Sequence, residues 1–262
     1  MAENKAIVNR KPKTKRDPKA ILAPLAVLVI IIAALEIGLR AFDVPSYVMP
    51  LPMNILTGTI EQFHVILPDM LFTIKMILIG YIVAVPTGIL LAAVFSQIDL
   101  VVKATRPLII CLTITPMITL IPLMTLWMGT DPNLRVIIVI IQAVPIICLN
   151  TLNGFTTVEQ EKLELARSVG AGKLQTFVYV TFMNAMPQVF TGLKLGCIFS
   201  TIGAVSADFV SRNIGLGDRI IKFLKYSNFE QSYGCIIIIA LIGIIFYTIV
   251  EMIEKRVVLW KK

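Results

Sequence analysis

Side chains able to carry out acid–base, nucleophilic or metal chemistry are scarce in this sequence. The only histidine, His64, has no cysteine or histidine neighbour, so it is a poor candidate for a metal site. The four cysteines each fall in or beside an apolar run and form no CxxC pair, which favours buried small hydrophobic residues: Cys111, Cys148, Cys197 and Cys235. Without a convergent nucleophile, base or metal cluster, the sequence argues against a membrane enzyme.

The segment GAGK at 170–173 is similar in letters to a phosphate-binding loop. A Walker A loop needs a glycine five residues before Gly172, and that position is Arg167. It also needs serine or threonine at the next position, which is Leu174. The sequence therefore predicts no nucleotide site and no cofactor in this chain.

Ionisable residues in apolar runs are candidates for a solute pathway, because a charge inside a bilayer is costly and usually functional. Lys75 and Lys194 lie in such runs. Asp208 follows another run, where pairing with a basic residue would close an outer gate. Glu36 and Arg40 are four residues apart, which favours an ion pair near the membrane interface over a role in the pathway.

The composition indicates which elements position these residues. Of the 262 residues, 57% are apolar and 15% charged, and the mean hydropathy is +0.86. A helix needs about 20 apolar residues to cross the ~30 Å core of a bilayer. The sequence therefore predicts an all-α, polytopic membrane protein with six transmembrane helices, at 20–41, 70–96, 107–128, 134–153, 186–207 and 233–253. Breaks in the third and fourth spans are predicted at Pro116, Pro122 and Pro145.

Lysine and arginine orient these spans. A basic tail at 1–19 precedes the membrane domain at 20–255, and a second basic tail follows at 256–262. The positive-inside rule places both termini in the cytoplasm, so the net charge of +8 reflects topology rather than nucleic-acid binding. One loop, 208–232, is expected outside although it is basic, with Arg212, Arg219, Lys222 and Lys225.

Small residues recur every fourth position in two spans, which favours close packing of helices in lipid. Gly80 and Gly88 belong to the stripe in the second span, and Gly192 and Gly196 to the stripe in the fifth. Contact between helices of one subunit and contact between two subunits both remain open.

The cytoplasmic loop 156–187 carries strong helix signals. A capping box is predicted at its start, by Thr157 with Gln160 or by Thr156 with Glu159. Gly170 is placed to end this helix at the C′ position. A second helix is expected from about Lys173, so that the loop forms a helix–turn–helix projecting from the membrane.

This loop resembles the EAA motif of binding-protein-dependent ABC transporter permeases. The acidic residue, the last alanine and the glycine of the motif match Glu164, Ala166 and Gly170. Leu165 replaces the middle alanine, and Met183 replaces the proline that ends the motif. Matches also lie at Pro187, which is common in the nitrate/sulfonate/taurine-type branch, and at 205–217, which ends in GLG.

The resemblance implies a type I ABC importer permease in a bacterial cell (inner) membrane. It implies a dimeric ATPase partner that binds ATP and Mg and docks at Glu164, Ala166, Gly170 and Ala171. It also implies an extracytoplasmic substrate-binding protein and a second copy of the chain. The solute would be a sulfonate, taurine, nitrate or a vitamin precursor.

A secondary transporter or channel working without ATP is the alternative. It would need matching inverted repeats with broken helices, or a relay of carboxylates inside the membrane. Neither pattern is clear in this sequence, and neither would use a docking helix in the cytoplasmic loop.

Overall fold

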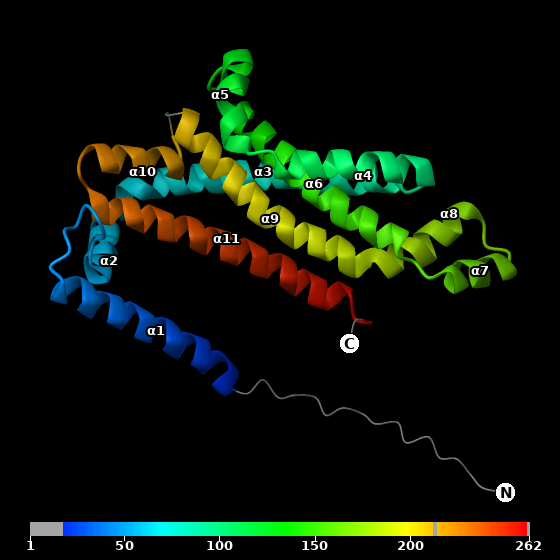
Figure 1. Ribbon diagram of the computed structural model, residues 1–262, viewed down its shortest axis with the longest axis horizontal. Coiled ribbons are helices and arrows are strands. Elements are labelled where there is room, and N and C mark those ends of the chain that lie inside the picture. The colour runs from blue at the N-terminus through cyan, green and yellow to red at the C-terminus, as the bar shows by residue number, and fades with distance from the viewer. Residues whose placement is uncertain (1–17, 212–213, 261–262) are drawn as a thin grey trace, which may run out of the picture.

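The computed structural model describes residues 18–211 and 214–260, with the side chains of 18–25 and 211 left out. The regular elements in these residues are all helical (Figure 1). In chain order they are α1 (Pro18–Ala41), α2 (Pro52–Glu61), α3 (Phe63–Phe95), α4 (Asp99–Ile114), α5 (Met117–Met128), α6 (Pro132–Thr156), α7 (Gln160–Ser168), α8 (Lys173–Thr176), the π-helical segment η1 (Phe177–Phe182), α9 (Met183–Ser211), α10 (Leu216–Lys225) and α11 (Phe229–Val257).

Helix α6 is the centre of the bundle, because it packs against both α3 and α9. Glycines allow this close approach. A Cβ added at Gly80 would lie 2.5 Å from Val139 Cγ1, and one added at Gly88 would lie 2.8 Å from Ile147 Cγ2. On the other side of α6, a Cβ at Gly192 would lie 3.1 Å from the carbonyl oxygen of Ile147. Both stripes of small residues therefore contact a helix of the same chain.

Gly196 belongs to the same packing, since a Cβ there would lie 2.8 Å from the side chain of Ile147. Ile147 is fully buried, and the core around it includes Ala84, Ala143 and Cys197. The buried state of Cys197 agrees with the interpretation of the cysteines as small hydrophobic residues, although Cys111 is exposed.

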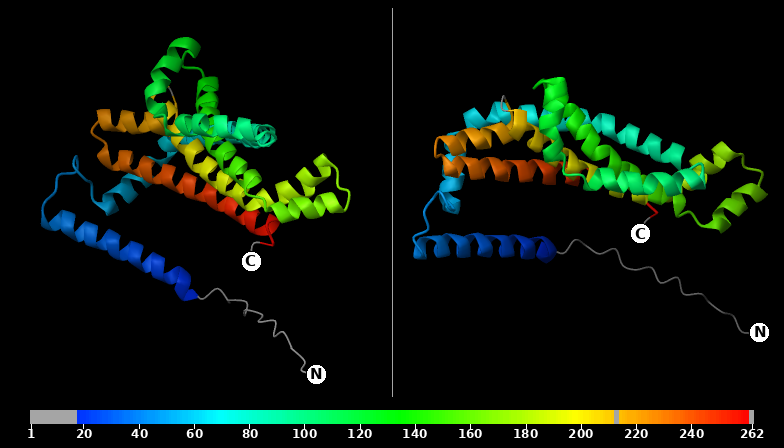
Figure 2. Two further views of the ribbon diagram at one scale, coloured as in Figure 1. Left: turned by 45° about the vertical axis from the view of Figure 1, so that its right-hand side comes forward. Right: turned by 45° about the horizontal axis from the view of Figure 1, so that its top comes forward.

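Four helices in the described residues are long and apolar enough to cross a membrane: α3, α6, the continuous helix Lys173–Val210 and α11. The pair α4 and α5 makes a fifth candidate if it is counted as one span. The first expected span, 20–41, coincides with helix α1, but residues 18–25 lie outside the part of the chain whose side chains are described. Helix α1 lies at the edge of the structure, next to α2 and away from α6 and α9 (Figures 1 and 2).

The expected third span at 107–128 is a bent pair, because α4 and α5 meet at an angle of 88°, and the predicted break at Pro116 is confirmed. The break falls at Pro116, which has no N–H, and Thr115 before it is extended, with ψ 122°. A residue before proline avoids the α region, so the chain turns there. The expectation that Pro122 and Pro145 also break helices is wrong, since both lie inside continuous helices.

Candidate functional site

The loop between α6 and α9 carries α7 and α8 beyond one end of the bundle, opposite the end that carries α10 (Figure 1). The predicted capping box is wrong. Thr157 is the C-cap of α6, and its hydroxyl donates a hydrogen bond back to the carbonyl of Asn153 at 2.9 Å. Helix α7 begins at Gln160 with Glu159 as its N-cap, without a side-chain hydrogen bond at the cap. The hydroxyl is therefore used by the preceding helix, and α7 starts two residues later than a cap at Thr157 would place it.

The predicted end of α7 is confirmed. Gly170 has φ +78°, a left-handed conformation that glycine adopts without steric cost. The N–H of Gly170 donates to the carbonyl of Arg167 at 3.0 Å, and the N–H of Ala171 donates to the carbonyl of Ala166 at 3.0 Å. These two bonds form a Schellman motif, which satisfies carbonyls left free at a helix end. The turn is thus fixed by the local backbone.

A cavity of about 810 Å³ opens at this turn, and we call it the docking groove. Its lining consists of Lys162, Leu165, Ala166, Val169, Gly170, Ala171, Gln175, Thr176, Tyr179 and Val180. Ala166 is buried beneath it, whereas Leu165 is 67% exposed and Tyr179 72% exposed. Large apolar side chains exposed around a concavity are typical of a surface that binds another protein. Glu164 is exposed on the same helix, but it does not line the groove.

The second helix of this loop continues directly into the membrane domain. The segments α8, η1 and α9 form one helix from Lys173 to Val210. Phe177 and Phe182 on η1 pack against Phe155 near the end of α6, with ring centroids 5.2 Å and 6.1 Å from its ring. One wall of the docking groove is therefore continuous with α9 and packed against α6.

A buried polar network lies at the opposite end of the bundle, close to α10. Arg135 on α6 and Asp208 on α9 form an ion pair with Nε 3.0 Å from Oδ1, and each side chain is only 1% exposed. Thr73 on α3 donates a hydrogen bond of 2.7 Å to the other carboxylate oxygen. The Arg135 guanidinium also donates to the carbonyls of Ile214 and Thr130. Three helices and two loops are thus joined through one buried pair.

The same network holds the start of α10. The N–H of Gly215 donates to Asp69 Oδ1 at 2.9 Å, and Arg219 Nε lies 2.5 Å from Asp69 Oδ2. Gly215 has φ +122°, and a Cβ there would collide with the carboxylate of Asp208. Glycine is therefore required by the backbone conformation and by the space beside Asp208.

Ion pairs within the fold account for part of the positive charge in loop 208–232, which was expected outside the membrane. Arg219 pairs with Asp69, and Lys222 pairs with Asp218 at 2.5 Å. Arg212 lies outside the described residues. At least two of the four basic side chains are thus neutralised by carboxylates within the fold.

The three candidate pathway residues have different surroundings. Asp208 is enclosed in the network just described. Lys194 Nζ lies 2.6 Å from Glu254 Oε2, an ion pair that joins α9 to α11. Lys75 is exposed on α3 and takes part in none of the ion pairs found in residues 18–211 and 214–260. The structure therefore does not bring the three together.

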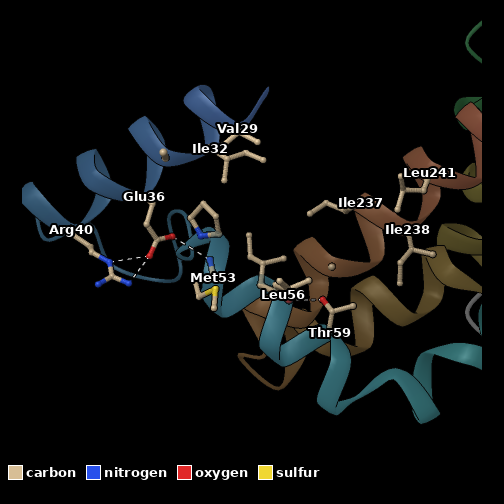
Figure 3. Close-up of a pocket in the computed structure, with 14 residues that line it drawn as sticks. Val29, Ile32, Glu36, Arg40, Met53, Leu56, Thr59, Ile237, Ile238 and Leu241 are labelled. Atoms are coloured by element: carbon tan, nitrogen blue, oxygen red, sulfur yellow. Dashed lines mark hydrogen bonds and ion pairs between the residues drawn. The ribbon is translucent and has the colours of Figure 1, made fainter. Parts of the chain in front are cut away.

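A large apolar cavity of about 780 Å³ lies between α1, α2 and α11 (Figure 3). At its edge Arg40 pairs with Glu36 at 2.6 Å, as the sequence predicted. Glu36 also accepts a hydrogen bond of 3.2 Å from the N–H of Met53 on α2. The charges at this edge thus hold α1 against α2, and the rest of the lining is mostly aliphatic.

Sequence reasoning missed Arg135, Asp69 and Thr73. Of these three, only Arg135 could have been identified from the sequence, because an arginine at the start of an apolar run is an intramembrane charge and therefore a functional candidate. Thr73 carries no such signal, since an isolated threonine in an apolar helix usually bonds to its own backbone.

Comparison with known proteins decides the family. The model of the family described as binding-protein-dependent transport system inner membrane component matches residues 84–259, which include α7 and the Gly170 turn. The chain belongs to this family. It is thus the permease component of an importer, a multi-pass protein of the inner membrane, and ATP hydrolysis belongs to a partner subunit.

Curated relatives agree with this assignment. The formylaminopyrimidine transport permease ThiX of Halalkalibacterium halodurans is 27% identical over 95% of this chain and 99% of its own length. The putative aliphatic sulfonates transport permease SsuC of Bacillus subtilis is 24% identical over 98% and 94%. The taurine transport permease TauC of Escherichia coli is 23% identical over 67% and 62%.

The fold of the permease also matches a solved structure. A crystal structure of an amino acid ABC transporter with histidines superposes with a TM-score of 0.61 at 17% identity, over 76% of this chain and 97% of the other. The family assignment removes the secondary transporter and the membrane enzyme from consideration, since the permease works with an ATPase and a binding protein.

Proposed function

We propose that the docking groove at the Gly170 turn is the site where the partner ATPase binds and drives transport. Glu164, Ala166, Gly170 and Ala171 belong to this coupling surface. The observation that carries the proposal is the pair of exposed apolar side chains, Leu165 and Tyr179, on a cavity beyond the apolar part of the bundle. Closure of the ATPase then moves α6 and α9 together.

The permease forms a type I fold with six spans, with α1 as the first and the bent pair α4–α5 as the third. Both termini are cytoplasmic, and the α10 end faces the extracytoplasmic binding protein. Two copies of the chain enclose the path, and the ATPase is a dimer. The positive charge of the two tails and the basic residues Lys162, Arg167 and Lys173 of the EAA-like loop support this orientation.

The solute is a small molecule of the kind named for the relatives, namely a pyrimidine vitamin precursor, an aliphatic sulfonate, taurine or nitrate. Among the three candidate pathway residues, Lys75 remains the best contact for such a solute, because its ammonium group is exposed on α3. Lys194 and Asp208 act instead through their partners on neighbouring helices, which makes them positioning residues.

Leu165→Glu tests the ATPase site. A carboxylate placed in an apolar interface without a partner costs about 3 kcal/mol, which corresponds to about a hundredfold weaker binding. The matched control is Gln160→Glu, which adds the same charge to the first turn of the same helix, outside the groove. The negative charge is favourable there because of the helix dipole.

The measurement is the molar ratio of ATPase to permease after purification of the tagged permease in mild detergent. The ATPase is recognised by mass spectrometry of a subunit with a Walker A loop. We expect Leu165→Glu to lose the ATPase and Gln160→Glu to retain it. Full retention by Leu165→Glu, in a variant that elutes as a folded protein, contradicts the proposal.

A further inference from the structure

A second hollow adjoins the docking groove, and its far side is formed by Trp260. We call this cavity of about 440 Å³ the tail hollow; its lining consists of Lys162, Tyr179, Val180, Met183, Asn184 and Trp260. Three of these residues, Lys162, Tyr179 and Val180, also line the docking groove. The two cavities are therefore parts of one surface that runs from the Gly170 turn to Trp260.

The end of α11 is anchored at this place by specific contacts. Val258 follows α11 and is buried, with its N–H donating to the carbonyl of Glu254 at 2.8 Å. Glu254 in turn pairs with Lys194 on α9. Val258 belongs to the same core cluster as Phe190 on α9. The position of Trp260 beside η1 is therefore set by the packing of Val258, two residues earlier.

Trp260 is nevertheless 53% exposed, as is much of Tyr179 across the hollow. Tryptophan and tyrosine are enriched among the residues that contribute most to protein–protein binding, because each buries a large apolar area with few rotatable bonds. Lys255 and Arg256 are exposed one turn earlier. A partner that covers this surface would present an apolar pocket bordered by acidic side chains.

We propose that the ATPase binding site extends across the tail hollow onto Trp260, so that the ATPase contacts the end of α11 as well as α7. This rests on the proposed function, since it is the same ATPase that binds the docking groove. The consequence is a second path for the applied force. Movement of the ATPase reaches α11 directly, and the Lys194–Glu254 pair carries it from α11 to α9.

A membrane surface is the competing occupant, because a tryptophan with neighbouring lysines can also lie at a lipid headgroup layer. The structure favours the ATPase. Trp260 lines a cavity whose other wall is η1 and whose residues continue into the docking groove. Binding to lipid headgroups does not require a tryptophan to line a cavity between two protein segments, as Trp260 does in the tail hollow.

Photo-crosslinking in the purified permease–ATPase complex distinguishes the two. A benzophenone amino acid is incorporated at position 260 and, as a control, at position 127. Trp127 is 80% exposed on α5 and lines neither cavity. We expect an adduct with the ATPase from position 260 and none from position 127. Adducts with lipid alone at position 260, in a complex that still contains the ATPase, overturn the proposal.

Substitution provides a second readout. We expect Trp260→Ala to bind the ATPase about tenfold more weakly, as for a residue at a binding hot spot, and Trp127→Ala to bind it normally. Unchanged binding by Trp260→Ala also overturns the proposal. Leu165→Glu distinguishes a failure of the docking groove from a failure of its extension onto Trp260. If Leu165→Glu releases the ATPase while position 260 gives no ATPase adduct, the docking groove stands and only its extension is rejected.

Discussion

Neutralising one member of the buried Arg135–Asp208 pair should be among the most damaging single changes in this permease. In Asp208→Asn the side chain keeps its shape and still accepts a hydrogen bond from Thr73, but the guanidinium 3.0 Å away loses its counter-charge. Both side chains are 1% exposed, so water cannot compensate. Removing one partner of a buried pair costs about 3–5 kcal/mol, because the other charge stays buried.

The corresponding loss of thermal stability is about 10 °C, since about 1 kcal/mol changes the melting temperature of a chain of this size by about 2–4 °C. The assay is size-exclusion chromatography of the detergent-solubilised permease after heating, which measures the temperature at which the monodisperse peak disappears. Arg135→Met should cause a similar loss, because it leaves the Asp208 carboxylate buried without a cation.

The double variant Arg135→Met with Asp208→Asn tests whether the two effects share one cause. We expect it to recover most of the loss, because no unpaired charge remains in the buried site. A loss in the double variant equal to the sum of the two single losses would refute the reasoning. The control is Glu251→Gln, which breaks the exposed pair with Lys255 and should cost less than about 1 kcal/mol.

Two other variants test helix packing. Gly80→Leu should destabilise the permease by about 1–3 kcal/mol, because even a Cβ at this position lies 2.5 Å from Val139. The control is Gly38→Ala, whose Cβ meets nothing within 4 Å, so that it should be neutral or stabilising in the same melting assay. Lys194→Met should cost about 3 kcal/mol, because Glu254 is buried and loses its lysine partner. Adding Glu254→Gln should restore most of this loss, and no recovery would mean that the pair does not couple α9 to α11.

The sequence alone predicted the helical class and the position of the helix pair between α6 and α9. A long apolar run forms a helix in lipid, because its backbone must satisfy its hydrogen bonds within the segment. Four of the six expected spans coincide, to within one residue at their ends, with segments of the candidate membrane helices. The end of α7 was also predictable, since a glycine after a helical run is a local signal that the Gly170 turn bears out.

Errors in the sequence prediction arose at one residue that two neighbouring helices could use and at prolines whose effect depends on tertiary contacts. Thr157 carries a capping signal for α7, yet its hydroxyl caps α6, whose last turn ends at that residue. Pro116, Pro122 and Pro145 look alike in the sequence, but only Pro116 ends a helix. Which proline breaks a helix depends on the neighbours that satisfy the freed carbonyl, and these neighbours are not local.

What the sequence determined by itself is therefore everything that depends on short-range periodicity and charge: helices, their approximate ends, the motif in the loop and the expected orientation. Only the tertiary structure decided which charges meet. Thr73 and Asp208 are 135 residues apart, and Arg135 reaches Asp208 from a third helix. The tail hollow likewise exists only because Trp260, which follows α11, lies across from η1. Such contacts depend on how whole helices pack, and side-chain spacing within one helix indicates which face packs but not which residues of another helix it meets.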